Sequence, residues 1–338
     1  MMKRHISLLA LALLVITALN LPRAYAAPPP FESWLPAFKA EAISSGINAE
    51  LVERAFSGKT PDPEIIKLDQ KQPEFTQTFN AYSTKRVSRD RIEKGREMYI
   101  KHYDELLRAS DHYGVAPQYI TALWGMETNY GGYTGKKDIV RSLMTLAWNG
   151  RDGTSPKRAA YFRKELINVL KIIQQGHFSL EEMRGSWAGA FGQVQFMPSS
   201  FLNLAVDGDG DGRIDIRENL PDAFFSAANY LSKNKWITDQ RWGREVKVPA
   251  GFNASLINEK KSLSSWHQLG LTTKYSSPIP VEPGMQATFL APDGLSGRNF
   301  LVYNNFNTIK RWNNSNSFAL SVGLLADSIA ASAPRLTD

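Results

Sequence analysis

The sequence predicts a mainly α-helical protein with a small β region, that is, an α+β fold. Through most of residues 31–236, apolar residues recur every three or four positions, which is the period of a helix with one buried face. After Trp242 the pattern changes to alternating apolar residues separated by turn-forming residues. Helical spacing returns from Asn305. We therefore expect a helical body, a β insertion near the C-terminal third, and C-terminal helices that rejoin the body.

The first 26 residues have the features of a secretory signal peptide. Two basic residues precede an apolar run over residues 6–21, and Ala24-Tyr25-Ala26 supplies a cleavage site. A membrane anchor is the alternative, but Thr17 and Asn20 interrupt the run, which is short for a membrane span. Cleavage after Ala26 would leave 338 − 26 = 312 residues. We expect this mature protein to lie in the periplasm and to have no membrane anchor.

The composition excludes several kinds of site and partner. The sequence has no cysteine, which excludes disulfides, thiolate zinc sites and a lipid-modified cysteine after the signal segment. The formal net charge is +7, and removal of Lys3, Arg4 and Arg23 leaves 7 − 3 = +4. This mild excess suits an anionic polymer outside the cytoplasm, whereas the export signal argues against nucleic acid as a partner.

Regular apolar spacing predicts individual helices over residues 91–112, 157–175, 305–312 and 317–331. A further helix is expected from Pro221 to Lys233, because proline is favoured in the first turn. Ser179-Leu-Glu-Glu182 matches a capping box and predicts a helix start.

Strands are predicted only in the β insertion. Residues 245–248 alternate as a strand does, and residues 286–290 and 299–303 flank the turn-rich segment 292–297 as a hairpin would. These patterns divide the chain into a signal peptide (1–26), an N-terminal helical region (27–115), a helical core (116–243), a small β region (244–304) and returning helices (305–338).

Residues 207–218 fit the twelve-residue calcium loop of an EF-hand at each diagnostic position. Gly212 allows the sharp turn at position 6. An acidic surface turn is the alternative. Because calcium sensors usually pair such loops and no second loop occurs, we expect one structural Ca²⁺. Its expected ligands are Asp207, Asp209, Asp211, the carbonyl of Arg213, Asp215 and both carboxylate oxygens of Glu218.

Glu127 lies where a core residue is expected. Ile120, Leu123 and Trp124 form one apolar stripe of a helix, and Glu127 occupies the next position on it. Gly131-Gly132 predicts that this helix ends soon afterwards. The negative end of the helix dipole and the apolar neighbours both favour the protonated form of the carboxyl group, as a general acid requires. A buried ion pair with an arginine or lysine explains the pattern equally well.

The segment 185–198 combines three glycines and two alanines with bulky aromatic residues, as a ligand groove can, although a packed helix junction is the more economical interpretation. If the segment is extended, Gln193 and Gln195 project together. Aromatic residues that can stack on sugar faces are Trp148, Tyr161, Tyr230, Trp312 and Phe318. Zinc-binding histidine spacing, Gly-x-Ser-x-Gly and nucleotide-binding glycine patterns do not occur.

From about Phe79 to the C-terminus, the sequence resembles the lytic murein transglycosylase B family, glycoside hydrolase family 103. The resemblance is carried by Gly125-Met-Glu-Thr128, Gly185-Ser-Trp-Ala-Gly-Ala190, Gln195-Phe-Met-Pro-Ser-Ser200, the calcium loop and Arg311-Trp-Asn-Asn-Ser-Asn316. It implies a lysozyme-like helical core, an N-terminal helical region around it and a small β region that holds the calcium loop between them.

The resemblance also implies a function. The family cleaves the β-1,4 bond between MurNAc and GlcNAc in peptidoglycan without water and leaves 1,6-anhydro-MurNAc ends. Its single catalytic acid matches Glu127, Ser186 matches a serine that binds the MurNAc N-acetyl group, and Gln195 matches a saccharide-binding glutamine. Other cell-wall enzymes are candidate partners. The remaining positions that match or replace groove residues of the family are Tyr82, Arg158, Phe196, Tyr230, Trp312, Asn313 and Phe318.

The chain departs from the family at Trp312 and Phe318, where tyrosine is usual, so two hydroxyl groups near the acid are absent. Two-carboxylate glycosidases need a second acid across the bond, and none stands out near the motifs. The substrate's N-acetyl group and 6-hydroxyl would then complete the reaction. Two alternatives use the same groove: hydrolysis by water, and binding of peptidoglycan without catalysis.

Overall fold

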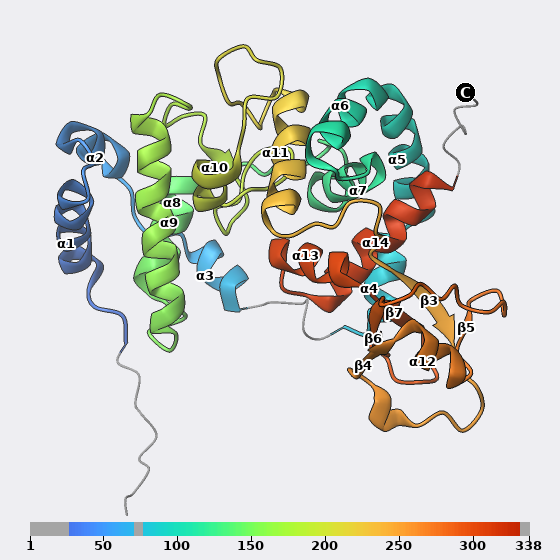
Figure 1. Cartoon of the computed structure of the whole chain (residues 1–338). Helices are drawn as coiled ribbons and strands as arrows, with labels where there is room; N and C mark the ends of the chain where they lie inside the picture. The colour runs from blue at the N-terminus through green and yellow to red at the C-terminus, as the bar shows by residue number, and fades with distance from the viewer. Residues whose placement is uncertain (1–26, 71–76, 332–338) are drawn as a thin grey trace, which may run out of the picture.

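The computed structural model describes residues 27–70 and 77–331, so the expected signal peptide lies outside the described residues. Figure 1 shows a helical body beside a small β region. No helix among the described residues is long and apolar enough to cross a membrane. The mainly helical fold class is confirmed.

The N-terminal helices wrap one end of the helical body and pass along its side (Figure 1). They are α1 (Phe31–Ser44), α2 (Ala49–Phe56), α3 (Pro63–Gln70), α4 (Phe79–Arg86), α5 (Arg89–Lys101) and α6 (Tyr103–Tyr113). The central helices are α7 (Pro117–Thr128), α8 (Ile139–Asn149), α9 (Pro156–Gln174), α10 (Pro198–Leu204) and α11 (Leu220–Lys233). The two returning helices are α13 (Asn304–Trp312) and α14 (Asn316–Ala330).

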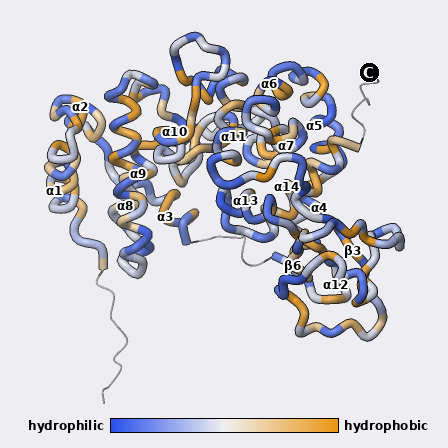
Figure 2. The backbone as a smooth tube through the Cα atoms, viewed as in Figure 1, coloured by the Kyte–Doolittle hydropathy of each residue, from blue (hydrophilic) through white to orange (hydrophobic). Residues whose placement is uncertain are grey.

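One hydrophobic core joins these helices, from Trp34 in α1 to Ile329 in α14. Figure 2 shows hydrophobic and hydrophilic residues interspersed along the helices, as one-sided burial requires. α14 packs against α4, α5 and α7. The last helix of the chain therefore completes the core around α7, the helix that carries Glu127.

The β region contains a five-stranded antiparallel sheet in the order β4-β6-β7-β3-β5. Its strands are β3 (Gly243–Lys247), β4 (Lys260–Ser262), β5 (Thr272–Thr273), β6 (Gln286–Leu290) and β7 (Asn299–Val302), with α12 (Leu263–Gln268) beside them. β6 and β7 form the predicted hairpin, with Phe289 opposite Leu301. The region has a core of its own around Trp266 and Phe289.

Two expectations about local structure were wrong. The helix expected over residues 91–112 breaks at His102, whose ring packs edge-on against Trp124 and Phe224, so that α6 can turn to pack on α11. Ser179 and Glu182 exchange the hydrogen bonds of a capping box, but no helix follows. Instead the chain enters β2 (Arg184–Gly185), which pairs with β1 (Lys137–Asp138), a short ladder that the sequence pattern did not predict.

The condition attached to the glutamines of the segment 185–198 is not met. This segment is not extended at Gln193 and Gln195: Phe191 and Phe196 pair across a tight turn, and Gln195 has a φ of +50°. The side chains of the two glutamines are therefore used differently. In addition, the calcium loop lies between α10 and α11 and contributes nothing to the five-stranded sheet, so the β region does not hold it as the resemblance implied.

Candidate active site

Glu127 lies in the last turn of α7, and its side chain is partly exposed. The indole Nε1–H of Trp312, at the end of α13, donates a hydrogen bond of 2.9 Å to its Oε1. Residues far apart in the sequence therefore meet at the carboxyl group. The acid borders the core without being enclosed by it, as a group that acts on a bound molecule must.

α7 ends at Thr128, and two residues separate it from the glycine pair that was expected to stop it. Asn129 and Tyr130 both adopt left-handed backbone conformations, with φ of +53° and +58°. Tyr130 then folds back between α5 and α7, and its hydroxyl donates to the carbonyl of Arg91. A Cβ on Gly125 would lie 2.5 Å from the Tyr130 ring, so glycine at this helical position makes room for the aromatic side chain that fixes the turn after Glu127.

Gln193 connects the last turn of α7 to the segment 185–198. Its Oε1 accepts from Trp124 Nε1 at 2.8 Å, and its backbone carbonyl accepts from Thr128 Oγ1 at 2.8 Å. Its Nε2 donates to the carbonyl of Arg217 at the end of the calcium loop. Gln193 therefore couples the helix of Glu127 to the calcium loop. The sequence pattern offered this glutamine as a groove residue, and only the fold shows this connecting position.

Three aromatic side chains form a cluster beside Glu127. The ring of Trp312 lies 4.6 Å from that of Tyr230 and 5.3 Å from that of Phe196, centroid to centroid. The Tyr230 hydroxyl donates to the carbonyl of Arg311, which ties α11 to α13. Burial raises the pKa of Tyr230, so the hydroxyl keeps its proton at neutral pH. The cluster fixes the indole that donates to Glu127.

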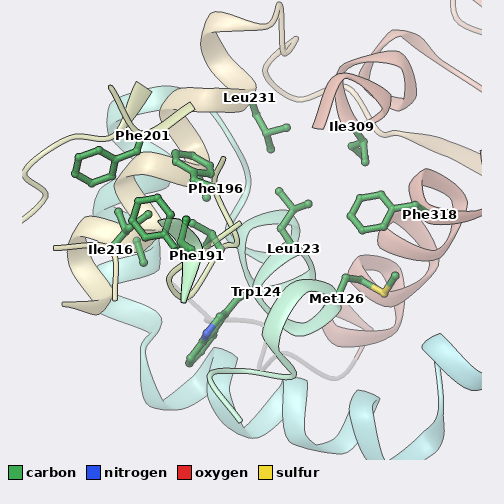
Figure 3. Packing of buried hydrophobic residues seen from close by; sticks show 14 of the residues in the cluster. Leu123, Trp124, Met126, Phe191, Phe196, Phe201, Ile216, Leu231, Ile309 and Phe318 are labelled. Carbon is green, nitrogen blue, oxygen red and sulfur yellow. The ribbon is translucent and has the colours of Figure 1, made fainter. Parts of the chain in front are cut away.

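The predicted groove residues differ in how much of them reaches the surface. Phe196 and Phe318 are only 2% and 4% exposed and belong to the core, and Tyr82 is also buried. Figure 3 shows Phe318 and Ile309 directed toward Leu123 and Met126 of α7. The predicted groove residues with partly exposed side chains are Ser186, Gln195, Arg158, Tyr230, Trp312 and Asn313.

Ser186 and Gln195 form hydrogen bonds that hold the segment carrying Phe196, the residue that contacts Trp312. Ser186 Oγ accepts from the amide of Ala190 at 3.0 Å, and the Ser186 amide donates to the Ala190 carbonyl. Gln195 Nε2 donates to the carbonyls of Thr134 and Gly192. Since an amide side chain also carries an acceptor oxygen, Gln195 is held in place with its acceptor still able to bind a ligand.

Arg158 at the start of α9 forms an ion pair with Asp69 of α3, an acid that is 3% exposed. Its Nε donates to Asp69 Oδ1 at 2.9 Å. This contact fixes the guanidinium and connects the N-terminal region to the core. Asp69 had no sequence signal beyond lying in a helix.

Two further acids support the site, and sequence reasoning missed both. Glu165 is 2% exposed and accepts hydrogen bonds from the amide and the hydroxyl of Ser199, which fixes the start of α10. Asp222 is fully buried and accepts from the amides of Gly208 and Asp215, the second and ninth residues of the calcium loop. Burial raises the pKa of Asp222. In the sequence, Asp222 could have been noticed only through the pattern Asn219-x-x-Asp222, which resembles a capping box at a helix start.

The calcium loop gathers three of its expected ligands. Oxygen atoms of Asp207, Asp209 and Asp211 lie within 4.8 Å of one another, as ligands of one Ca²⁺ would. The amides of Gly210 and Gly212 donate to Asp207, and this bonding lowers the pKa of its carboxyl group. Asp215 instead accepts from the amides of Arg217 and Glu218. The Glu218 side chain is 80% exposed.

The family is established by comparison with known proteins. The model of the transglycosylase SLT domain family matches residues 30–327. The chain belongs to this family. It is 33% identical over 255 residues to membrane-bound lytic murein transglycosylase B of Escherichia coli. This match covers 74% of the chain and 66% of the length of the E. coli protein.

Solved structures of family members have the same fold. SltB3 of Pseudomonas aeruginosa, in complex with NAG-anhNAM-pentapeptide, is 40% identical with a TM-score of 0.82, over 91% of this chain and 83% of that chain. The E. coli lytic transglycosylase Slt35, in complex with calcium, is 29% identical with a TM-score of 0.75, over 88% of this chain and 93% of that chain. The expected family and lysozyme-like fold are thus confirmed.

Proposed function

We propose that this transglycosylase cleaves the MurNAc–GlcNAc β-1,4 bond of peptidoglycan without water and leaves 1,6-anhydro-MurNAc ends. The observation that carries the proposal is Glu127, a partly exposed acid in the last turn of α7 that accepts a hydrogen bond from Trp312 beside an aromatic cluster. The complex of SltB3 with an anhydro sugar peptide supports this reaction. We also propose the periplasm as the location.

Glu127 acts alone as acid and then as base. The buried acids among the described residues serve the scaffold: Asp69 binds Arg158, Glu165 binds Ser199, and Asp222 binds the calcium loop. Glu127 gives its proton to the glycosidic oxygen as the bond to the anomeric carbon breaks. The resulting carboxylate then takes the proton of the MurNAc 6-hydroxyl as that oxygen bonds to the anomeric carbon, so no water is consumed and the acid is restored.

The surrounding residues bind and orient the sugar. Ser186 and Gln195 offer a hydroxyl and an amide oxygen to the N-acetyl group and to sugar hydroxyls, while Tyr230, Trp312 and Asn313 line the groove. Arg158, fixed by Asp69, adds a charged contact. Tyr82, Phe196 and Phe318 are buried, and they support these groups through packing in the core.

The mass of the products tests the reaction. Purified sacculi digested by the protein should release muropeptides whose new ends each lack one water relative to a hydrolysed end. A digestion in ¹⁸O-labelled water should leave these ends unlabelled. Ends of hydrolysed mass that carry the label would show that water attacks the anomeric carbon, and the transglycosylase reaction would be rejected.

We expect Trp312→Phe to lower kcat about tenfold, because a hydrogen bond to a charged group contributes about 1.5 kcal/mol or more. The phenyl ring keeps contact with Phe196 and Tyr230 but donates nothing to Glu127. Since the lost N–H favours the ionised carboxylate, the alkaline limb of the pH–rate profile should move to higher pH. Trp312→Tyr, which restores a donor, should recover part of the loss. An unchanged profile in Trp312→Phe would contradict this role.

We propose that the loop 207–218 binds one structural Ca²⁺ through Asp207, Asp209 and Asp211, with the Arg213 carbonyl, Asp215 and Glu218 completing the shell. Chelation should then lower Tm by roughly 5 °C, since saturating Ca²⁺ adds about 2–3 kcal/mol to the free energy of unfolding. Asp209→Asn/Asp211→Asn should melt at the chelated value with or without Ca²⁺. Equal melting curves of the parent with Ca²⁺ and with chelator would refute the site.

A further inference from the structure

A cavity of about 1020 Å³ lies where the helical body meets the β region, apart from the residues assigned to the cleavage site. Residues of α4, α5 and the C-terminal half of α14 form one side, and residues of β3 and β5 with their flanking segments form the other. In Figure 1, α4 and α14 lie next to β3 and β7. Junctions between separately packed regions are common places for ligand sites.

The lining of this cavity is strongly basic. It contains six basic residues and two acids, an excess of 6 − 2 = +4. The same excess, 7 − 3 = +4, is the formal net charge of residues 27–338. Outside the cavity the basic and acidic side chains of residues 27–338 therefore balance, and the cavity carries an excess of positive charge whose field favours an anion. The basic residues are Arg89, Arg96, Arg241, Arg244, Lys274 and Arg298.

Both acids of the lining are already bound by arginine. Arg298 donates to both oxygens of Glu245 at 2.8 and 2.9 Å. Arg241 lies 3.0 Å from Asp327, whose pKa burial raises. The two acids are therefore neutralised within the wall.

Three basic residues of the lining are not paired with a carboxylate among residues 27–70 and 77–331. They are Arg96, Arg244 and Lys274. Arg96 donates to the carbonyl of Ser328 at 2.9 and 3.1 Å, and Arg244 donates to the Tyr303 hydroxyl at 2.6 Å. Neutral acceptors thus hold both guanidinium groups while N–H donors remain unused. A planar carboxylate fits such a fork.

We propose that this cavity binds carboxylate groups of the peptide stems of peptidoglycan, at a distance from the bond that Glu127 cleaves. The inference rests on the proposed function, which supplies a substrate with many stems. In stem-bearing peptidoglycan an amide bond joins each MurNAc lactyl group to its stem, so the glycan is neutral and the carboxylates belong to the stems. Hydroxyl groups of Ser88 and Thr273 add donors to the lining, and the 78% exposed ring of Tyr275 stands beside Lys274.

The test compares Arg244→Gln/Lys274→Gln with a control that loses the same charge outside the cavity, Lys233→Gln/Lys260→Gln. Binding is measured by co-sedimentation in the Glu127→Gln background, where cleavage does not interfere. The ligands are sacculi with stems and glycan strands from which an amidase has removed the stems, with the lactyl carboxylates that this cleavage frees converted to amides. Inorganic phosphate and a phosphodiester polymer serve as competitors.

We expect the cavity variant to bind stem-bearing sacculi about tenfold more weakly than the parent, because two partly exposed ion pairs are lost. The control should bind like the parent, and both should bind stem-free glycan equally. With Glu127 restored, the cavity variant should cleave stem-free glycan at the parent's rate. Lys274→Gln alone, an exposed position, guards against a folding defect and should give a smaller loss of the same kind.

Equal binding of stem-bearing sacculi by the parent and both cavity variants would overturn the inference, even if the parent cleaves glycan normally. Competition by the phosphodiester polymer, with no preference for stems, would also overturn it and assign the cavity to phosphate. A parent that fails to cleave any glycan would instead refute the proposed function, so the two failures are distinguishable.

Discussion

Glu127→Gln should abolish the release of anhydro-muropeptides from sacculi, with a loss of about 10³-fold or more in kcat. Loss of a general acid alone typically costs 10²–10⁴-fold, and here the same group also acts as the base. The amide has nearly the same shape as the carboxyl group, and its oxygen can still accept the hydrogen bond of Trp312. Product release is measured by chromatography and mass spectrometry.

The fold should survive this substitution, because Glu127 is partly exposed and the amide keeps its volume. The melting temperature should therefore stay within about 1–2 °C of the parent. Glu97→Gln, at an exposed position of α5, is the control for loss of one acid and should be fully active. Near-normal turnover by Glu127→Gln would remove this residue from the mechanism.

Gly125→Ala should destabilise the protein by about 1–3 kcal/mol, the usual cost of overpacking a core. The new methyl group would lie 2.5 Å from the Tyr130 ring. The ring cannot move away, because its hydroxyl already packs closely against Gly95. Activity should also fall, since Tyr130 fixes the backbone that follows Glu127. Thermal unfolding and kcat measure the two effects.

A double-mutant cycle identifies the cause. Tyr130→Ala on its own removes a buried aromatic ring and should be destabilising. In the Gly125→Ala background the same change relieves the clash, so its cost should be clearly smaller. Additive effects, or a Gly125→Ala protein as stable as the parent, would mean that Tyr130 does not require the glycine.

Much of the fold could be predicted from local patterns. The helices that became α9, α11, α13 and α14 and the hairpin of β6 and β7 follow directly from spacing, because each buries one face along its whole length. The break at His102 could not be predicted, since the residues around it are good helix formers. Packing of its ring against Trp124 and Phe224 accompanies the break, and these partners lie far along the chain.

The site was predictable in its elements but not in its connections. The spacing of Glu127 on an apolar stripe and the twelve-residue acidic loop are local features that sequence alone displays. Gln193 and Asp222, by contrast, couple the helix of the acid to that loop and fix the loop itself through contacts between distant segments.

By itself, the sequence determined the helical fold class, the family motifs, the acidic loop and the presence of one acid at the end of a helix. Only the tertiary structure decided what that acid touches. Trp312 lies 185 residues further along the chain, and its approach to Glu127 depends on α14 packing against α7 and on α13 packing against α14. The same long-range packing turned Phe318 into the core and gathered basic residues from separate segments into one cavity, because burial and charge depend on neighbours that spacing along the chain does not specify.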